Sequence, residues 1–595
     1  ANSEQVNQII DIAEKDPAGW RKTTLEERHR ILFEASNRLG EMRGDLIGCM
    51  CAVTGKTVIE GDVEVSEGID YARFYTTSMK TFAALPDVDI APKGTVLVIS
   101  PWNFPCAIPI GGIVAALAGG NTVILKPATV AAPVAWMFAQ AFWEAGIPKE
   151  ALQVIITDRE ALKVLTTAPA IKHIILTGGT DTAQNIANSN PATPFSAETG
   201  GKNAIILTAS GDRDHAIMNI VTSAFGNAGQ KCSACSLLLV ERSIYEDPNF
   251  QDKLKDATTS LKVGSVWDSG NMVGPMITNK NEKLLEALQL EPGESWLVPP
   301  RFLDKNKYIL APTVKWGVKP GSYSFRTELF GPMLSVVCIE NLQEGIDWVN
   351  ALDYGLTSGL QSLDEREQKL WKNSIEAGNL YINRGITGAI VNRQPFGGMK
   401  FSAFGGGVKA GGPNYCTCFV KITDKLDSKT DYAKSYATAY EKEFAHARDV
   451  NNLYGEQNAF RYLPVENMVL RLFSGDTNEQ ARMIALAAKI CHTPLDLSFS
   501  PDDDRTEALA STGCVLKKET LSAFCDSLVN YSRVRTCSPD IPMQLYEKSA
   551  TINQYIATAP PVKDGRVELI HYIQEQCISF EYHRYGSIAE VPPVE

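Results

Sequence analysis

Residues 94–128 read GTVLVISPWNFPCAIPIGGIVAALAGGNTVILKPA, with two β-branched apolar runs on either side of an apolar segment that contains several glycines. The runs at 95–100 and 122–127 predict buried strands, and the segment between them predicts a helix. A strand, a helix and a strand in this order predict two parallel strands joined by a crossover. The central segment, 106–120, is too short to span a bilayer, so we expect a buried helix.

The same alternation continues along the chain. Further helices are predicted from AAPVAWMFAQAFWEAG, REALKVLTTAP and TDTAQNIANSN, and further strands from ALQVIIT and IKHIILTGG. Near-continuous apolar strands that alternate with helices are typical of a parallel sheet covered on both faces. We therefore predict a doubly wound α/β domain over residues 1–204, which includes amphipathic helices at its N-terminus.

Three further regions follow. Residues 205–412 predict a second α/β domain whose end is rich in glycine and phenylalanine. We interpret that end as a loop that lines a site, and a flexible linker is the alternative. Residues 413–429 contain the run PNYCTCFVKI, a candidate strand for pairing between subunits, and then a linker. Residues 430–595 predict an extra α/β module for structure or assembly, since no glycine fingerprint follows its first strand.

Composition narrows the class of protein. The 595 residues carry a formal net charge of -12, and lysine and arginine are scattered, so no nucleic-acid partner is expected. No membrane span is predicted, and we expect a soluble protein. Thirteen cysteines without regular pairing indicate a reducing compartment, either the cytoplasm or one such as the mitochondrial matrix. The Cys232 and Cys235 pair is also compatible with a redox pair or with half of a zinc site. A complete metal site needs a second ligand pair, which we do not find.

Two polar residues stand 34 positions apart in runs that suit catalysis: Glu198 in SAETGGKNAIIL and Cys232 in FGNAGQKCSACSLLLV. A thiolate can attack an aldehyde to form a thiohemiacetal, which becomes a thioester once it has lost a hydride. A carboxylate can then act as general base on the water that hydrolyses the thioester. The alternatives are an inert buried cysteine and a glutamate that caps a helix or forms an ion pair.

Seven motifs occur in one order along the chain: SPWNFP, LKPA, LTGGT, ETGGKN, GQKCSA, ELFGP and PFGG. In this order they resemble the aldehyde dehydrogenase superfamily over residues 1 to about 425. The runs GQKCSACS, NRGITGAIVNRQPFGGMK and KAGGPNY are similar to the L-glutamate γ-semialdehyde (pyrroline-5-carboxylate) dehydrogenases, especially the half that is fused to proline dehydrogenase in bifunctional proline-utilisation proteins. The C-terminal module resembles the extension that some of those proteins carry.

The resemblance implies a catalytic set and a cofactor. Cys232 would be the nucleophile, Glu198 the general base, and Asn103 the oxyanion donor together with the backbone N–H of Cys232. NAD is the implied cofactor. Its pyrophosphate would lie at a strand-to-helix turn, and its riboses and the walls of its cleft would be contacted from other motifs. The cofactor-binding residues implied are Trp102, Lys126, Gly178, Gly179, Thr180, Glu328 and Phe330.

One position departs from the family. Many relatives have a glutamate after KPA that disfavours a 2′-phosphate, and this chain has Thr129 there. For the substrate, the resemblance implies that the Ser233 hydroxyl and backbone N–H groups at Gly388 and Ala389 bind a carboxylate. A plain surface turn is the alternative at Gly388.

The implied reaction is the NAD-dependent oxidation of L-glutamate γ-semialdehyde to L-glutamate in proline breakdown. An aldehyde dehydrogenase for another semialdehyde is one alternative, and a largely scaffolding subunit is another, suggested by the C-terminal module. The resemblance also implies a homo-oligomer. The chain begins without Met and resembles half of a bifunctional protein, so we expect a proline dehydrogenase partner, separate or fused.

Overall fold

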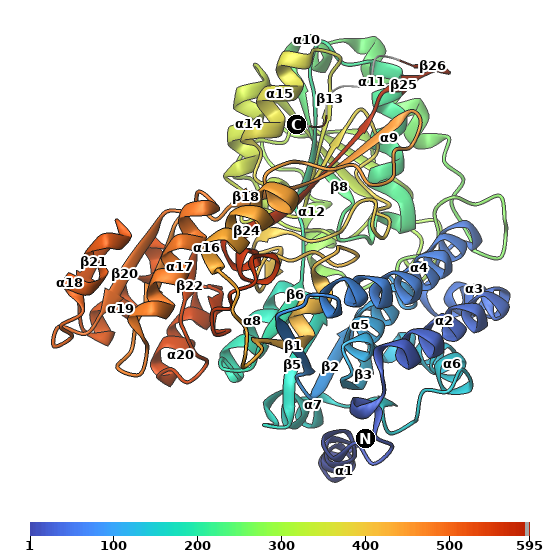
Figure 1. Ribbon diagram of the computed structural model, residues 1–595. Coiled ribbons are helices and arrows are strands. Elements are labelled where there is room, and N and C mark those ends of the chain that lie inside the picture. The colour runs from blue at the N-terminus through green and yellow to red at the C-terminus, as the bar shows by residue number, and fades with distance from the viewer. Residues whose placement is uncertain (589–593, 595) are drawn as a thin grey trace.

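The computed structural model describes residues 1–588 and 594 (Figure 1). Three sheets organise the chain: one of six strands, one of nine and one of five. The six-stranded sheet has the order β16-β6-β5-β2-β3-β4. Its strands are β2 (Thr95–Ser100), β3 (Thr122–Pro127), β4 (Leu152–Val154), β5 (Ile171–Thr177), β6 (Phe195–Glu198) and β16 (Ala403–Phe404).

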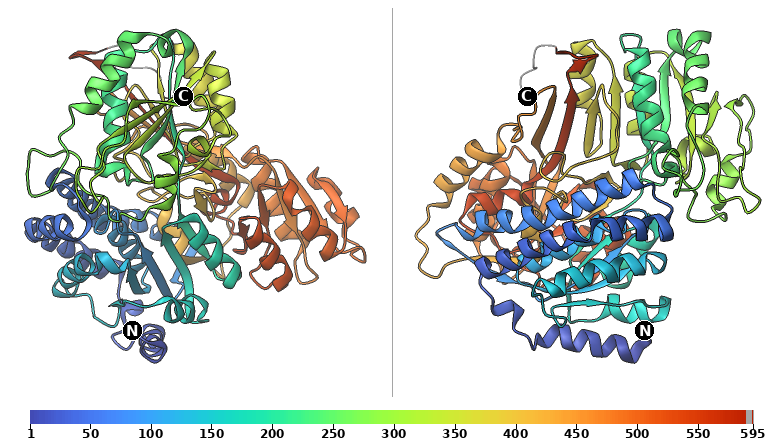
Figure 2. Two further views of the ribbon diagram at one scale, coloured as in Figure 1. Left: turned by 180° about the vertical axis from the view of Figure 1, so that it is seen from behind. Right: turned by 90° about the vertical axis from the view of Figure 1, so that its right-hand side faces the viewer.

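Successive residues of the central strand β2 pack into two separate cores, one on each face of the sheet. Val96 and Val98 pack under the helices of one face, whereas Leu97 and Ile99 pack under those of the other. The first face is covered by α2 (Leu25–Glu41), α4 (Val58–Ala83), α5 (Ala107–Ala118) and α6 (Ala132–Glu144). The second is covered by α1 (Ser3–Lys15), α7 (Arg159–Thr167) and α8 (Thr180–Ser189) (Figure 2). The doubly wound prediction is confirmed.

The strand order reverses between β2 and β5, which are neighbours in space and parallel. In open α/β sheets a crevice forms at such a point, outside the carboxyl ends of the strands. The turns that carry Asn103 and Gly178 leave those two strand ends. Helix α5, predicted as a buried helix, is buried along nearly its whole length. Across residues 1–588, no helix is long and apolar enough to cross a membrane.

The nine-stranded sheet belongs to the second domain and has the order β18-β24-β14-β13-β7-β8-β11-β10-β9. Seven of its strands come from the second α/β region predicted from the sequence, called the catalytic domain below: β7 (Asn203–Leu207), β8 (Cys235–Glu241), β9 (Ser295–Val298), β10 (Thr313–Trp316), β11 (Met333–Ile339), β13 (Thr357–Gln361) and β14 (Asn379–Ile382). Its remaining strands, β18 (Glu456–Pro464) and β24 (Ile573–Glu581), come from the C-terminal region. Strand β24 pairs in parallel with β14.

The predicted domain boundaries therefore need two corrections. Residues 430–595 were expected to form one module, but β18 and β24 extend the catalytic sheet because β14 offers an edge for pairing. Likewise, β16 lies inside residues 205–412 but pairs with β6 of the six-stranded sheet. The six-stranded sheet is called the nucleotide sheet below. Residues 589–593 and 595 of the predicted module lie outside the described residues.

Between β18 and β24, the C-terminal region forms its own parallel sheet in the order β21-β20-β19-β22-β23 (Figure 1). The strands are β19 (Met468–Arg471), β20 (Leu495–Phe499), β21 (Val515–Lys518), β22 (Arg533–Arg535) and β23 (Ile556–Ala557). Helices α17 (Asn478–Ile490) and α19 (Leu521–Ser527) lie between strands, in agreement with the predicted α/β character of this region. The alternation of strand and helix again produces a parallel sheet.

Only the end of the predicted intersubunit strand, residues 420–422 of the run at 413–422, lies in a strand, because Tyr415–Phe419 forms a short 3-10 helix. That strand, β17 (Val420–Asp424), pairs antiparallel with β1 (Val88–Pro92) of the same chain. Ile90 and Ile422 pack against the core of the C-terminal region. Among the described strands, this ribbon has no third partner. Its pairing with another subunit stays a prediction.

A buried ion pair fixes the start of α5 and the turn before it. Lys56 and Glu64 lie 2.7 Å apart and are almost fully buried. Glu64 accepts hydrogen bonds from the backbone N–H of Cys106 at 2.7 Å and Ala107 at 3.2 Å. Lys56 Nζ also lies 3.9 Å from the centre of the Phe104 ring, next to Asn103. The pair therefore positions the turn that carries Asn103.

Replacing one member of this pair leaves a buried charge without its partner. We expect Lys56→Met to lower the free energy of unfolding by about 3–5 kcal/mol, measured on the first urea unfolding transition. The double variant Lys56→Met with Glu64→Gln is the control. It should recover part of the loss, because it buries no unpaired charge. Equal losses in the single and double variants would contradict this explanation.

Candidate active site

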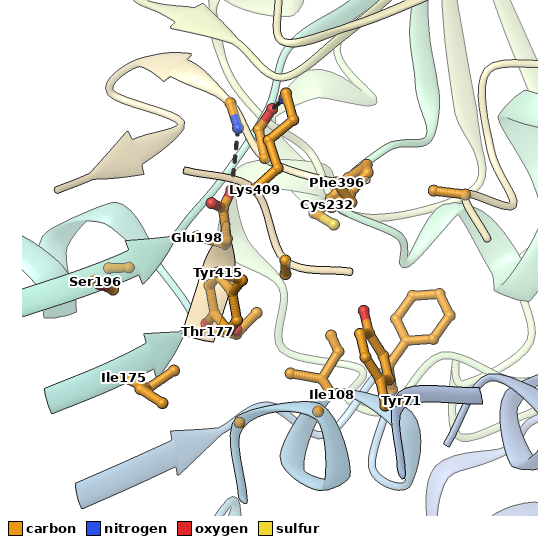
Figure 3. Close-up of a pocket in the computed structure, with 18 of the residues that line it drawn as sticks. Tyr71, Ile108, Ile175, Thr177, Ser196, Glu198, Cys232, Phe396, Lys409 and Tyr415 are labelled. Carbon is orange, nitrogen blue, oxygen red and sulfur yellow. Dashed lines mark hydrogen bonds between the residues drawn. The ribbon is translucent and has the colours of Figure 1, made fainter. Parts of the chain in front are cut away.

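A cavity of about 240 Å³ lies between the nucleotide sheet, α4 and the catalytic domain. Five of the predicted site residues line it together: Glu198, Cys232, Ser233, Gly388 and Ala389. Figure 3 shows Glu198 and Cys232 on its wall, with Lys409, Phe396, Tyr415 and Tyr71 around the same space. Segments almost 200 residues apart in the sequence thus meet at one cavity.

Cys232 follows a tight turn that its neighbours enforce. Asn227, Ala228 and Gly229 all have left-handed backbone conformations, with φ of 52°, 53° and 68°. A Cβ added to Gly229 would lie 2.2 Å from the Gly331 carbonyl oxygen, so only glycine fits there. Beyond the turn, the Cys232 carbonyl accepts a hydrogen bond of 2.6 Å from the Asn203 side chain. The turn and this bond hold the thiol at the cavity.

The surroundings of Cys232 favour the neutral thiol. Burial raises the pKa of Cys232 to about 12, and the negative charges of Glu328 and Glu198 add to that rise. The backbone N–H groups of Ser233 and Cys232 oppose it. A thiolate is the reactive form, so a proton acceptor or a bound group must favour its formation during the reaction.

Glu198 is the last residue of β6 and lies beside the glycine-rich loop. Its Oε2 accepts a hydrogen bond of 3.1 Å from the backbone N–H of Gly398. Burial raises the pKa of Glu198 to about 8, while the charge of Lys409 and the Gly398 N–H oppose that rise. A carboxyl with a pKa close to the working pH suits general base catalysis.

Asn103 is buried, and its Nδ2 donates a hydrogen bond of 3.0 Å to the carbonyl of Gln230. Gln230 precedes Cys232 by two residues, so the amide lies next to the nucleophile's turn. An asparagine amide has two N–H groups, and one is engaged here. The other is available to a ligand, which is compatible with the expected role as oxyanion donor.

Two of the residues expected to bind the cofactor are aromatic and pack against each other. Trp102 and Phe330 make an edge-to-face contact with ring centres 5.7 Å apart. Phe330 has a left-handed backbone with φ of 50°. The adjacent Glu328 accepts a hydrogen bond of 2.9 Å from the Gly201 N–H, and a Cβ on Gly200 would lie 2.5 Å from its Oε2. The two glycines of ETGG therefore allow Glu328 to approach the backbone.

The turn from β5 to α8 can hold an anion. Helix α8 begins at Thr180, and its N-cap, Gly179, makes no side-chain capping bond. The first N–H groups of the helix are therefore free to bind an anion, and the helix dipole favours a negative charge at this end. The Thr180 hydroxyl is buried at the start of the helix, beside the Tyr354 side chain. These residues fit a dinucleotide pyrophosphate.

Lys126 and Thr129 lie at the carboxyl end of β3. Lys126 is the fifth residue of that strand and is partly buried, which lowers its pKa from the usual value. Thr129 begins a short 3-10 helix and is exposed. Both residues thus flank the crevice edge of the nucleotide sheet.

The sequence alone did not predict several of the residues that line the cavity. Glu60 and Tyr71 come from α4 and line the cavity, and Glu60 forms an ion pair of 3.3 Å with Lys231 beside the nucleophile. Nothing in the pattern of an amphipathic helix marks these residues. Lys409 lies in the KAGGPNY run that the sequence analysis noted, yet its position beside Glu198 needs the folded chain.

Of the other cysteines, Cys418 also lines the cavity. Cys235 is buried in β8, and its thiol contacts the carbonyl of Leu237 at 3.2 Å. All thirteen cysteines are free. Within the part of the chain that the structure describes, no group of three His, Cys, Asp or Glu side chains could hold a metal ion.

Comparison with protein families matches residues 1–424 to the Aldehyde dehydrogenase family. The chain belongs to the aldehyde dehydrogenase family. A 1-pyrroline-5-carboxylate dehydrogenase of Geobacillus sp. (strain WCH70) is 34% identical over 436 residues, which cover 70% of this chain and 84% of that protein. The predicted family and fold class are therefore confirmed.

Two solved structures extend the comparison. Proline Utilization A (PutA) from Corynebacterium freiburgense is 37% identical with a TM-score of 0.86, covering 99% of this chain and 60% of that one. This chain thus spans less than two thirds of that PutA. The 1-pyrroline-5-carboxylate dehydrogenase from Thermus with bound NAD is 30% identical with a TM-score of 0.67, covering 71% of this chain and 86% of that one.

The pKa of Glu198 predicts how the rate depends on pH. Its carboxylate is the active form and becomes populated as pH rises through about 8. We expect hydrolysis of the acyl-enzyme to rise roughly tenfold per pH unit below that pKa and to level off above it. The measurement is the decay of an acylated Cys232 between pH 6 and 10. Glu198→Gln should be slow and flat with pH, and a variant that kept the wild-type profile would exclude Glu198 as the base.

Proposed function

We propose that this chain oxidises L-glutamate γ-semialdehyde, the open form of pyrroline-5-carboxylate, to L-glutamate with NAD as the electron acceptor. One observation carries the proposal: Cys232, Glu198, Ser233, Gly388 and Ala389 line a single cavity. The cavity thus contains the proposed nucleophile, the proposed base and the proposed hydrogen-bond donors to the substrate carboxylate. The names of the relatives, 1-pyrroline-5-carboxylate dehydrogenase and PutA, support the same substrate.

In the first step, the Cys232 sulfur attacks the aldehyde carbon and forms a thiohemiacetal. The free N–H of Asn103 and the backbone N–H of Cys232 would stabilise the negative charge on the former carbonyl oxygen. A bound nicotinamide would accept the hydride that this carbon loses, which leaves a thioester on Cys232. Trp102, Lys126, Gly178, Gly179, Thr180, Glu328 and Phe330 are the residues proposed to hold the dinucleotide.

In the second step, Glu198 removes a proton from a water molecule, and the water oxygen attacks the thioester carbon. The carbon–sulfur bond breaks, glutamate is released as the free acid and the sulfur of Cys232 regains a proton. The buried carboxyl is suited to this task because its raised pKa makes the carboxylate a stronger base than that of an exposed glutamate.

The substrate's head group would bind in the same cavity as the base, beside Ser233, Gly388 and Ala389. Gly388 has a φ of 84°, and a Cβ there would meet nothing within 4 Å, so the loop is open toward the cavity. The proposed donors to the carboxylate are the backbone N–H groups of Gly388 and Ala389 and the Ser233 hydroxyl. Binding by backbone donors explains how an anion can be held without an arginine.

We also propose a proline dehydrogenase partner, as a separate subunit or as part of a longer chain, and a homo-oligomer that uses β17. Support comes from the PutA that matches 99% of this chain. The free cysteines suit a reducing compartment such as the cytoplasm.

Steady-state formation of NADH tests the substrate. The kcat/KM with pyrroline-5-carboxylate should exceed that with succinic semialdehyde at least tenfold, since the second compound lacks the carbon that bears the ammonium group and therefore places its carboxylate closer to the aldehyde. Cys232→Ala should abolish turnover with both compounds. A preference for succinic semialdehyde would overturn the substrate, and an active Cys232→Ala variant would overturn the mechanism.

Thr129 predicts relaxed discrimination between dinucleotides. An uncharged residue here should not repel a 2′-phosphate, whereas a carboxylate would bind the ribose hydroxyls and repel the phosphate. We expect Thr129→Glu to lower the ratio of kcat/KM for NADP to that for NAD about tenfold. Thr129→Gln is the control for size without charge, and an unchanged ratio in Thr129→Glu would place this residue outside the adenosine site.

A further inference from the structure

Strand β24, which lies beyond the part matched to the aldehyde dehydrogenase family, touches the glycine-rich loop next to the active site. Glu575 and Cys577 are two residues apart on β24 and so face the same side of the sheet. The Cys577 thiol contacts the Pro395 carbonyl at 2.9 Å. Glu575 is buried, and its Oε2 accepts a hydrogen bond of 2.6 Å from the backbone N–H of Lys409.

The second oxygen of Glu575 is also engaged. Oε1 accepts a hydrogen bond of 2.7 Å from the Asn414 side chain. The backbone N–H of Glu575 in turn donates to the Gly407 carbonyl at 3.3 Å. The chain from Gly407 to Asn414 is therefore clamped on β24, and the backbone of Lys409 lies at the centre of the clamp.

The Lys409 side chain extends from this clamp toward Glu198. Lys409 is 2% exposed, and its ammonium group donates to the Gly397 carbonyl and, at 3.1 Å, to Asn379 Oδ1. Asn379 Oδ1 also accepts a hydrogen bond of 3.3 Å from the Gly397 N–H. The lysine thus fixes one specific peptide group of the PFGG motif.

That peptide group joins Lys409 to the catalytic base. Its carbonyl belongs to Gly397 and binds the ammonium, while its N–H belongs to Gly398 and donates to Glu198 Oε2 at 3.1 Å. Because a peptide group is planar, fixing the carbonyl also fixes the direction of the N–H. A cation on the carbonyl polarises the group and strengthens the bond that the N–H makes to a carboxylate.

We propose that Lys409 and Glu575 are positioning residues for thioester hydrolysis: Glu575 holds Lys409, Lys409 holds the Gly397–Gly398 peptide, and that peptide holds the Glu198 carboxylate. The inference rests on the proposed role of Glu198 as the hydrolytic base. It gives the C-terminal strand a direct effect on catalysis, through a buried carboxylate that the family match does not include.

The glycines along this path leave no room for a different arrangement. A Cβ added to Gly397 would lie 3.0 Å from Glu198 Oε1 and 3.2 Å from Lys409 Cγ. A Cβ added to Gly378 would lie 1.9 Å from the Gly397 carbonyl oxygen and 2.7 Å from Lys409 Nζ. The Gly397–Gly398 peptide is therefore in close contact with both Glu198 and Lys409.

The test follows one acyl group on Cys232. With p-nitrophenyl acetate, the Cys232 thiolate attacks the ester carbon and p-nitrophenolate leaves, so that acetyl-Cys232 forms. Water then attacks the thioester carbon as Glu198 takes its proton, and acetate leaves. Intact-protein mass spectrometry after removal of excess ester measures the lifetime of the adduct, without the semialdehyde or the dinucleotide.

Lys409→Met and Glu575→Gln should lengthen that lifetime roughly 10- to 100-fold, while the rate at which the adduct forms stays within about twofold of wild type. The matched control is Lys400→Met. Lys400 lies in the same loop, but its ammonium binds the Asn350 carbonyl and Glu376, away from Glu198. Its adduct should decay as in wild type.

Three results would overturn the proposal: unchanged lifetimes in both variants, an equal fall in formation and decay, or the same effect in Lys400→Met. An equal fall would indicate that the whole site had collapsed. If the wild type forms and hydrolyses the adduct but produces no NADH with pyrroline-5-carboxylate, the substrate assignment fails and the inference on Lys409 stands.

Discussion

The active site depends on one short pairing between distant parts of the chain, in which Ala403 and Phe404 of β16 lie antiparallel to Glu198 and Ala197 of β6. This pairing attaches the glycine-rich loop of the catalytic domain to the edge of the nucleotide sheet. It places Gly398 and Lys409 beside Glu198 and closes one wall of the cavity that contains Cys232. A hydrogen bond of 2.9 Å from the Thr199 N–H to the Ser402 carbonyl extends the same contact.

Burial is the main electrostatic influence on this boundary. It raises the pKa of Cys232 to about 12 and that of Glu198 to about 8, so both groups are mainly neutral near neutral pH. In this state a cysteine is a weak nucleophile and a carboxyl is a weak base, so the proposed reaction requires each group to lose its proton. The buried pair of Lys56 and Glu64 acts in a different way, since it holds the turn of Asn103 in place. Such pairs contribute more to position than to net stability.

The C-terminal region combines two modes of attachment. Its own five-stranded sheet packs against the β1–β17 ribbon, while β18 and β24 extend the catalytic sheet. Arg533, from the five-stranded sheet, donates a hydrogen bond of 2.9 Å to the Gly406 carbonyl in the glycine-rich loop. Together with Glu575, it anchors a loop that glycine alone would leave free to move. An extension of the chain thereby becomes part of the active-site wall.

The amino-acid sequence by itself determined the strands, the helices and the chemistry of single motifs. Apolar runs at 95–100 and 122–127 predict parallel strands because local periodicity and crossover rules act over short distances. Cys232 and Glu198 could be recognised by their motifs, and so could the glycine turn before α8. The tertiary structure alone decided where β24 pairs and that Glu60, Tyr71 and Lys409 meet at the cavity. Strand partners and cavity walls depend on contacts between residues hundreds of positions apart, and local sequence patterns do not encode those contacts.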